Sequence, residues 1–177
     1  MSFERVRSEV VWRGRIATVR VDTVRFDDGQ EAEREVVEHP GSVAVVAHDG
    51  ERVYLVRQPR EPVGEQALLE LPAGKLDEEG EAPLDTAKRE LAEEIGKGAE
   101  TWEHLTSVYT SPGFADETCH LFLATDLRDE SARAEENERI EIVTVPLSEL
   151  DATIAGCRDA KTVVGLLWLV GRLQVKG

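Results

Sequence analysis

The segment Gly74–Gly96 restricts the fold of this chain more than any other part of the sequence. A glycine-containing loop leads into Pro83, and proline is favoured in the first turn of a helix because its missing N–H would have no partner there. Gly96 and Gly98 are both able to end a helix that starts at Pro83. Apolar residues follow Pro83 at spacings of three and four, which predicts a helix with one apolar face, formed by Leu84, Ala87, Leu91 and Ile95.

Three glutamates share one side of this predicted helix. Glu90, Glu93 and Glu94 stand at positions i, i+3 and i+4 and therefore project together. The simplest interpretation is a solvated acidic helix, but Arg89 stands directly beside these acids. A cluster of oxygen ligands suits Mg²⁺, which is often shared with substrate phosphates. Two such ions about 3.5–4 Å apart can clamp the attacking and leaving oxygens of a displacement. The loop and Arg89 favour a metal site.

Composition narrows the class of protein. The formal net charge of -15 repels nucleic acids and anionic membranes, so we expect neither as a partner. The two cysteines, Cys119 and Cys157, lie far apart, which indicates free thiols in a reducing compartment. The N-terminus lacks an apolar run like that of a signal sequence, and the longest apolar stretch, Val163–Val170, is too short to span a bilayer. We therefore expect a cytoplasmic protein.

Strand and helix patterns are mixed along the chain. Alternation over Val10–Phe26 and Glu31–Glu38, around the turn Asp27–Gln30, predicts an N-terminal hairpin. The β-branched run Ser42–Ala47 predicts a buried strand. Further strands are expected at Val53–Gln58, Trp102–Thr110, Thr118–Thr125 and Ile140–Val145, with helices at Pro146–Ile154 and Asp159–Val175. The pattern predicts an α+β fold or a layered α/β/α arrangement around one core.

Two further segments have distinctive compositions, one charged and one apolar. Arg128–Arg139 is highly charged and is expected to be a loop. On the last helix the predicted apolar side consists of Val163, Leu166, Leu167, Val170 and Leu173. The helix residues Leu166, Trp168 and Leu173 could belong to the core or to an interface, and core is the commoner case.

The segment Gly74–Gly96 resembles the Nudix box. That pattern is a glycine, five residues, a glutamate, seven residues, and then Arg-Glu-apolar-x-Glu-Glu-x-Gly-apolar, and here Arg89–Gly96 follows its second half. The chain departs from it in two places: the loop 75–80 is one residue longer, and Lys97 takes the final apolar position. Lengthening a loop is cheap and leaves the helix spacing intact. The extra residue leaves Glu79 as an alternative to Glu81.

The resemblance implies a fold, a chemistry and a ligand set. The fold would be a Nudix α/β/α sandwich with a mixed central sheet, and the box would span residues 74–97. Glu90 and Glu94 would ligate Mg²⁺, for which Mn²⁺ could substitute, and Glu93 would ligate metal or hold its waters. The carbonyl oxygen of Ala73 would complete the coordination. Arg89 would hold the glutamates or the loop.

Flanking motifs are similar to those of ADP-ribose pyrophosphatases. The box entry Leu71–Leu76 resembles theirs, and Arg57–Arg60 is similar to a strand-end motif whose last arginine, here Arg60, contacts a substrate phosphate. The segment Ser111–Glu117 resembles their Ser-Pro-Gly motif, so that Pro112 and Gly113 are substrate-site candidates. The alternative is an ordinary Pro-Gly turn with no role in binding. The resemblance implies ADP-ribose as substrate. Another sugar nucleotide, such as GDP-mannose or ADP-glucose, and a non-catalytic ADP-ribose-binding module remain as alternatives.

A general base and a base-stacking site are also implied. In the ADP-ribose group a glutamate in a loop beyond the box takes the proton of the attacking water. Here Glu136 is the first choice, and Glu138 the second choice or an additional metal contact. Arg15 and Arg34 lie about where that group binds adenine, although either could be a surface charge.

The resemblance further implies a homodimer. Residues 1–40 would form an N-terminal β segment that serves as the dimerisation arm, and residues 41–177 the hydrolase domain.

Overall fold

The computed structural model describes residues 2–15, 17–131 and 139–175. Within it the chain forms two compact units. We call Met1–Gly41 with Tyr109–Thr118 the N-terminal unit, and Ser42–Val108 with Cys119–Gly177 the main unit.

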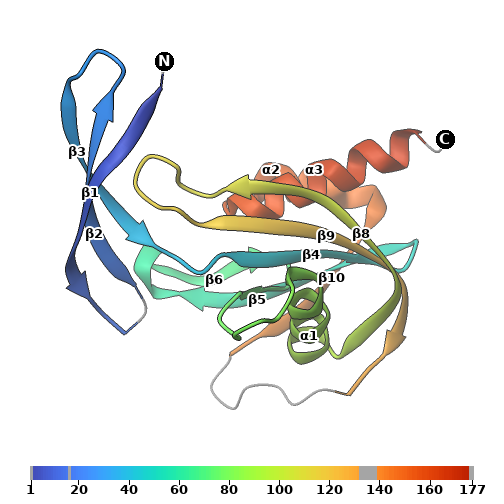
Figure 1. Ribbon diagram of the computed structural model, residues 1–177. Helices are drawn as coiled ribbons and strands as arrows, with labels where there is room; N and C mark the ends of the chain where they lie inside the picture. The colour runs from blue at the N-terminus through green and yellow to red at the C-terminus, as the bar shows by residue number, and fades with distance from the viewer. Residues whose placement is uncertain (1, 16, 132–138, 176–177) are drawn as a thin grey trace. The chain divides into compact units, whose positions relative to one another are not determined.

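The N-terminal unit is built on a three-stranded antiparallel sheet in the order β1-β2-β3 (Figure 1). Its strands are β1 (Phe3–Arg13), β2 (Thr18–Phe26) and β3 (Glu31–Glu38). The predicted hairpin is present as β2 and β3, joined by a turn at Gly29, whose φ of 85° suits glycine. The single strand expected over Val10–Phe26 was wrong at its start. Strand β1 is exposed along its whole length, so no apolar alternation marks it in the sequence.

The segment Tyr109–Thr118 completes the N-terminal unit. Ala115 forms a parallel bridge with Val37 of β3, and the N–H of Val37 donates to the carbonyl of Phe114 at 2.7 Å. Asp116 accepts from Arg20 Nη1 at 2.9 Å and from the backbone N–H of His39 at 2.8 Å. The Ser-Pro-Gly loop is therefore fixed to strands β2 and β3.

The main unit contains a seven-stranded mixed sheet. Its order is β10-β5-β4-β9-β8, with β6 on β5 and β7 on β4. Strands β4 and β9 pair in parallel, whereas β4–β5, β4–β7, β5–β6 and β5–β10 are antiparallel. The strands are β4 (Ser42–His48), β5 (Arg52–Arg60), β6 (Glu65–Glu70), β7 (Ala73–Lys75), β8 (Lys97–Tyr109), β9 (Thr118–Asp129) and β10 (Glu141–Pro146).

Helices cover both faces of this sheet, as Figure 1 shows. Helix α1 lies on one face, and helices α2 and α3 lie on the other. Strand β4 serves both layers, because alternate side chains of a strand point to opposite faces: Val43 and Val45 pack in the α1 layer, and Ala44 and Val46 in the α3 layer. The expected α/β/α sandwich is thereby confirmed. The helices are α1 (Pro83–Ile95), α2 (Leu150–Gly156) and α3 (Ala160–Val175), with 3₁₀ turns η1 (Glu61–Val63) and η2 (Leu147–Glu149).

The predicted apolar side of the last helix was wrong in part. Helix α3 buries Thr162, Gly165, Leu166 and Leu169, whereas Leu167, Trp168 and Leu173 are exposed. Small residues set this face: a Cβ at Gly165 would lie 2.6 Å from Leu71 and 2.8 Å from Val46. The helix therefore approaches the sheet closely at Gly165, with the large side chains of Leu166 and Leu169 buried on the same face.

The end of α1, the extent of β9 and the length of the helices bear on three further expectations. Helix α1 ends at Gly96, which adopts a left-handed φ of 66°, as predicted, but Gly98 belongs to β8. Arg128 belongs to strand β9 and not to a loop. In the part of the chain that the structure describes, no helix is long and apolar enough to cross a membrane.

Candidate active site

The first part of the site is the junction of strand β7 with helix α1. Gly74 pairs with Val43 of β4, and the side chain of Glu90 occupies the space beside it. A Cβ on Gly74 would lie 2.0 Å from Cδ of Glu90. The N–H of Ala73 donates to the carboxylate of Glu94 at 3.0 Å. Glycine leaves room here for the carboxylate that the helix places directly against the backbone of β7, so Ala73, Glu90 and Glu94 come together.

Arg89 gathers the other carboxylates of the box. Its Nη1 donates to Glu90 at 2.9 Å and to Glu93 at 3.1 Å, and its Nη2 donates to Glu81 at 3.1 Å. The hydrogen bond to Glu81 is the main reason why the pKa of Arg89 is raised above its ordinary value. The same bond holds the pKa of Glu81 below its ordinary value. Glu79 is exposed, so Glu81 is the loop glutamate of this network despite the longer loop.

This donor set suits a divalent cation. Among the described residues, no group of three or more His, Cys, Asp or Glu side chains is already arranged as a metal cage. The guanidinium of Arg89 nevertheless lies 2.9 and 3.1 Å from Glu90 and Glu93, so these carboxylates are close enough to share one positive charge. Carboxylates and a backbone carbonyl are the hard oxygen ligands that Mg²⁺ and similar ions prefer. The residues present therefore fit a divalent metal.

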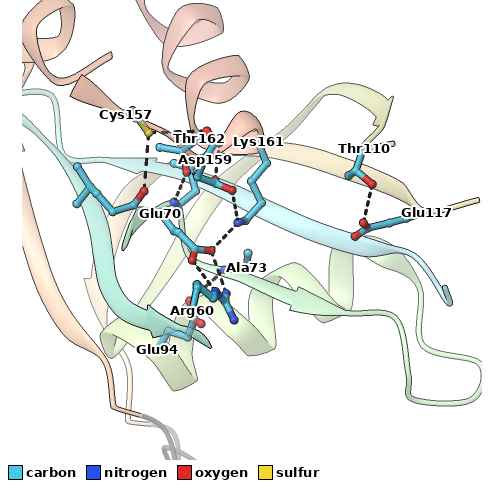
Figure 2. Close-up of polar contacts among 12 residues, drawn as sticks. Arg60, Glu70, Ala73, Glu94, Thr110, Glu117, Cys157, Asp159, Lys161 and Thr162 are labelled. Atoms are coloured by element: carbon cyan, nitrogen blue, oxygen red, sulfur yellow. Dashed lines mark hydrogen bonds and ion pairs between the residues drawn. The ribbon is translucent and has the colours of Figure 1, made fainter. Parts of the chain in front are cut away.

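A second cluster surrounds Glu70, and Figure 2 shows its contacts. Glu70 is only 1% exposed. Its carboxylate accepts from Arg60 Nε at 2.6 Å and from Nη2 at 2.9 Å, and from Lys161 Nζ at 2.5 Å. Burial alone would raise the pKa of Glu70, but the bond from Arg60 and the charge of Lys161 outweigh it and hold that pKa below its ordinary value. Glu70 is therefore a buried carboxylate held charged by two cations.

The start of helix α3 supports this second cluster. Asp159 accepts from Lys161 Nζ at 2.9 Å and from the N–H of Thr162 at 3.0 Å. The hydroxyl of Thr162 accepts from the N–H of Leu71 at 2.7 Å, two residues before the Ala73 backbone. Burial would lower the pKa of Lys161, but the charges of Asp159 and Glu70 raise it above its ordinary value. The cluster thus joins α3 to the entry of the box.

Sequence reasoning found Arg60 but missed Glu70 and Lys161. A usable signal for Glu70 was present, because a lone carboxylate stands within the apolar stretch Leu68–Leu71, and buried carboxylates need partners. No comparable signal exists for Lys161, which lies 91 residues further along the chain and meets Glu70 only through the fold.

The remaining predicted site residues fall in two places. Arg15, Arg34, Pro112 and Gly113 all belong to the N-terminal unit. Arg15 is exposed, and Arg34 donates to the carbonyl of Glu33 at 2.8 Å. The loop of Pro112 and Gly113 is closed by the N–H of Phe114, which donates to the carbonyl of Ser111 at 3.1 Å. The candidate bases Glu136 and Glu138 lie outside the described residues.

Comparisons with known proteins identify the class to which this fold and site belong. The NUDIX domain family matches residues 38–164, and the nucleoside diphosphate sugar hydrolase N-terminal domain matches residues 3–37. This chain is therefore a hydrolase, and its layered sheet with the glutamates of the loop and of α1 is the catalytic fold. The chain belongs to the Nudix family, whose hydrolases generally need divalent metal ions, and the resemblance seen in its box is confirmed.

Individual relatives cover nearly the whole chain. It is 41% identical over 169 residues to the methanol dehydrogenase activator of Bacillus methanolicus, covering 93% of this chain and 90% of the relative. It is 39% identical over 169 residues to the ADP-ribose pyrophosphatase of Bacillus subtilis, with the same coverage of 93% and 90%. Among solved structures, the crystal structure of an ADP compounds hydrolase superposes with a TM-score of 0.87 at 25% identity, covering 100% of this chain and 97% of that chain.

Proposed function

We propose that this protein hydrolyses the pyrophosphate bond of ADP-ribose and releases AMP and ribose 5-phosphate. The observation that carries the proposal is the packing of Glu90 and Glu94 of α1 against Ala73 and Gly74 of β7. This arrangement occurs in a chain similar over 93% of its length to an ADP-ribose pyrophosphatase. The likeness to an ADP compounds hydrolase supports the same nucleotide class.

The proposed metal is Mg²⁺, with Mn²⁺ able to substitute. Glu90, Glu94 and the carbonyl oxygen of Ala73 would hold it, and Glu93 would ligate it or hold its waters. A bound divalent ion supplies charge neutralisation of the diphosphate and lowers the pKa of a bound water. Arg89, which contacts both Glu90 and Glu93, keeps the carboxylates together against their mutual repulsion.

The proposed reaction is a displacement at phosphorus. The oxygen of a water molecule forms a new bond to one phosphorus, the bond from that phosphorus to the bridging oxygen breaks, and the other phosphate leaves with the electron pair. Glu136 or Glu138 takes the proton of the water. Arg60 steadies a phosphate, and the proposed remaining substrate contacts are Arg15, Arg34, Pro112 and Gly113.

We also propose that the protein is a cytoplasmic homodimer in which residues 1–40 form the dimerisation arm. Strand β1 exposes large apolar side chains, including Phe3, Val11 and Trp12, and burial of this apolar surface against a second copy supports the arm. Light scattering coupled to size-exclusion chromatography should give twice the mass of 19.6 kDa. A monomer at micromolar concentration contradicts the arm.

A substrate panel tests the activity. Purified protein with Mg²⁺ is given ADP-ribose, ADP-glucose and GDP-mannose, and products are identified by chromatography, because enzymes that share a fold and a box can differ in substrate. We expect the highest kcat/KM for ADP-ribose, since discrimination between substrates is expressed in that ratio. A higher value for GDP-mannose would replace the proposed substrate. Tight binding of ADP-ribose without AMP release would identify a binding module.

A further inference from the structure

Two cations contact the buried carboxylate of Glu70. Arg60 and Lys161 both contact it, at 2.6 and 2.5 Å. Removal of the sole cationic partner of a buried carboxylate leaves it unpaired at a large cost. With two partners, Glu70 stays paired when one of them moves away.

The contact with Arg60 fixes the orientation of its guanidinium. Glu70 takes the Nε and Nη2 edge, and two parallel bonds of this kind hold the guanidinium plane in a defined direction. The Nη1 group lies outside this pair, and the Arg60 side chain is 41% exposed. The charge of Glu94 contributes, after the bond to Glu70, to the raised pKa of Arg60. Arg60 is therefore oriented within electrostatic range of the box helix.

Lys161 is held where it can replace Arg60 as the partner of Glu70. It lies between the carboxylates of Glu70 and Asp159, and Asp159 is itself fixed by the N–H and hydroxyl of Thr162. The ammonium group therefore stays beside Glu70 whatever Arg60 does.

We propose that Glu70 and Lys161 are positioning residues for Arg60. Glu70 orients the guanidinium, and Lys161 keeps Glu70 paired while Arg60 engages the diphosphate of the substrate. The inference rests on the proposed function in one respect, that Arg60 contacts a substrate phosphate.

Steady-state kinetics with ADP-ribose test the role of Lys161. In Lys161→Met, Arg60 becomes the sole cation on Glu70 and is held away from substrate, so KM should rise about tenfold, the worth of one charged hydrogen bond. We expect kcat to change less than about twofold, because the reacting atoms are untouched. Lys161→Arg should restore KM. A purely structural role would lower the thermal stability of Lys161→Met and leave the KM of the folded enzyme unchanged.

Arg158→Met is the matched control. Arg158 pairs with Glu65 of the same strand β6, and its side chain is 76% exposed, so this change also removes a cation from a β6 carboxylate. It should leave KM within about twofold, since exposed ion pairs contribute little. An equal rise of KM in both variants overturns the proposal, as does an unchanged KM in Lys161→Met.

A second measurement does not depend on turnover. The Nε–H proton of Arg60, assigned by its loss in Arg60→Lys, should exchange slowly with water in the wild type and faster in Glu70→Gln. Titration with inorganic pyrophosphate should shift this signal, with a higher half-saturation in Lys161→Met. If ADP-ribose is not cleaved but these shifts occur, the proposed function fails and the positioning role stands. If pyrophosphate leaves the signal unmoved, the positioning role fails.

Discussion

The main unit contains two charged clusters that differ in origin: Arg89 gathers three carboxylates, whereas the buried Glu70 is held by two cations, Arg60 and Lys161. The Arg89 cluster draws all its partners from residues 81–93, within one loop and one helix. The Arg60 cluster joins β5, β6 and the start of α3. Helix periodicity alone brings the first cluster together, whereas the second exists only once the sheet and α3 have packed.

The clusters also differ in burial, which changes what their charges do. The side chains around Arg89 are partly exposed, so water compensates a carboxylate that changes partner. Glu70 is buried, so its charge must stay paired with protein groups. The partly exposed Arg89 cluster is therefore suited to exchange ligands, whereas the buried Glu70 cluster is suited to fix the positions of its side chains. We therefore expect changes in the first cluster to lower kcat, and the loss of the Glu70 charge from the second cluster to lower stability.

The largest effect is expected from Glu90→Gln. This change removes the charge of a proposed metal ligand and keeps its shape, and kcat should fall roughly 10³-fold, as for loss of a strong electrostatic contact in a catalytic site. Thermal stability should change little, because Glu90 is one of several acids that repel one another. Asp85→Asn, on the same helix and exposed, is the control and should keep full activity. Equal losses in the two variants would mean that α1 holds no catalytic metal.

The next effect concerns Glu70→Gln and should appear in stability. Lys161 and Arg60 then lose their shared anion, and unfolding in urea at pH 7 should become easier by about 3 kcal/mol, as for a broken buried ion pair. The folded pKa of Glu70 is depressed, so its stabilisation is present above the unfolded pKa of about 4.3 and is lost as the pH falls through the folded value.

The difference between wild type and Glu70→Gln should therefore shrink as the pH falls below the unfolded pKa of about 4.3, because the unfolded chain then binds a proton that folded Glu70 still excludes. The remaining difference is lost as the pH falls through the depressed folded pKa. Urea unfolding at pH 7 and at pH 3 checks this. A difference that is equal at both pH values would show that the charge of Glu70 contributes nothing.

What could be predicted from the sequence follows the same division. The box helix, its start at Pro83, its end at Gly96 and the central strand β4 agree with the structure, because each is set by local spacing. Strand β1 and the buried face of α3 were missed. Apolar periodicity does not mark them, because β1 is defined by its pairing with β2 and the face of α3 by its close approach to the sheet. Arg60 was found through its motif, but its partners Glu70 and Lys161 meet only by tertiary packing.

Gly74→Ala tests the contact between Glu90 and the backbone of β7 in the first cluster. The new Cβ would lie 2.0 Å from Cδ of Glu90, and the flexible end of that side chain would have to move. A displacement of this size can lower activity by roughly 10²-fold, while stability should change by less than about 1 kcal/mol, since a Gly-to-Ala change also restricts the unfolded chain. Gly171→Ala, which meets nothing within 4 Å, is the control. Assays of kcat and of urea unfolding decide, and a fully active Gly74→Ala would contradict the placement of Glu90.

The smallest effect is expected from Arg89→Lys. Lysine keeps the positive charge but lacks the planar fork that reaches Glu81, Glu90 and Glu93 together. The concentration of Mg²⁺ needed for half-maximal activity should rise roughly tenfold, as for other groups that orient metal ligands, and excess Mg²⁺ should restore kcat. A loss of kcat that no amount of Mg²⁺ restores would instead place Arg89 on the substrate. The two clusters would then no longer differ as proposed, because both arginines would contact the diphosphate.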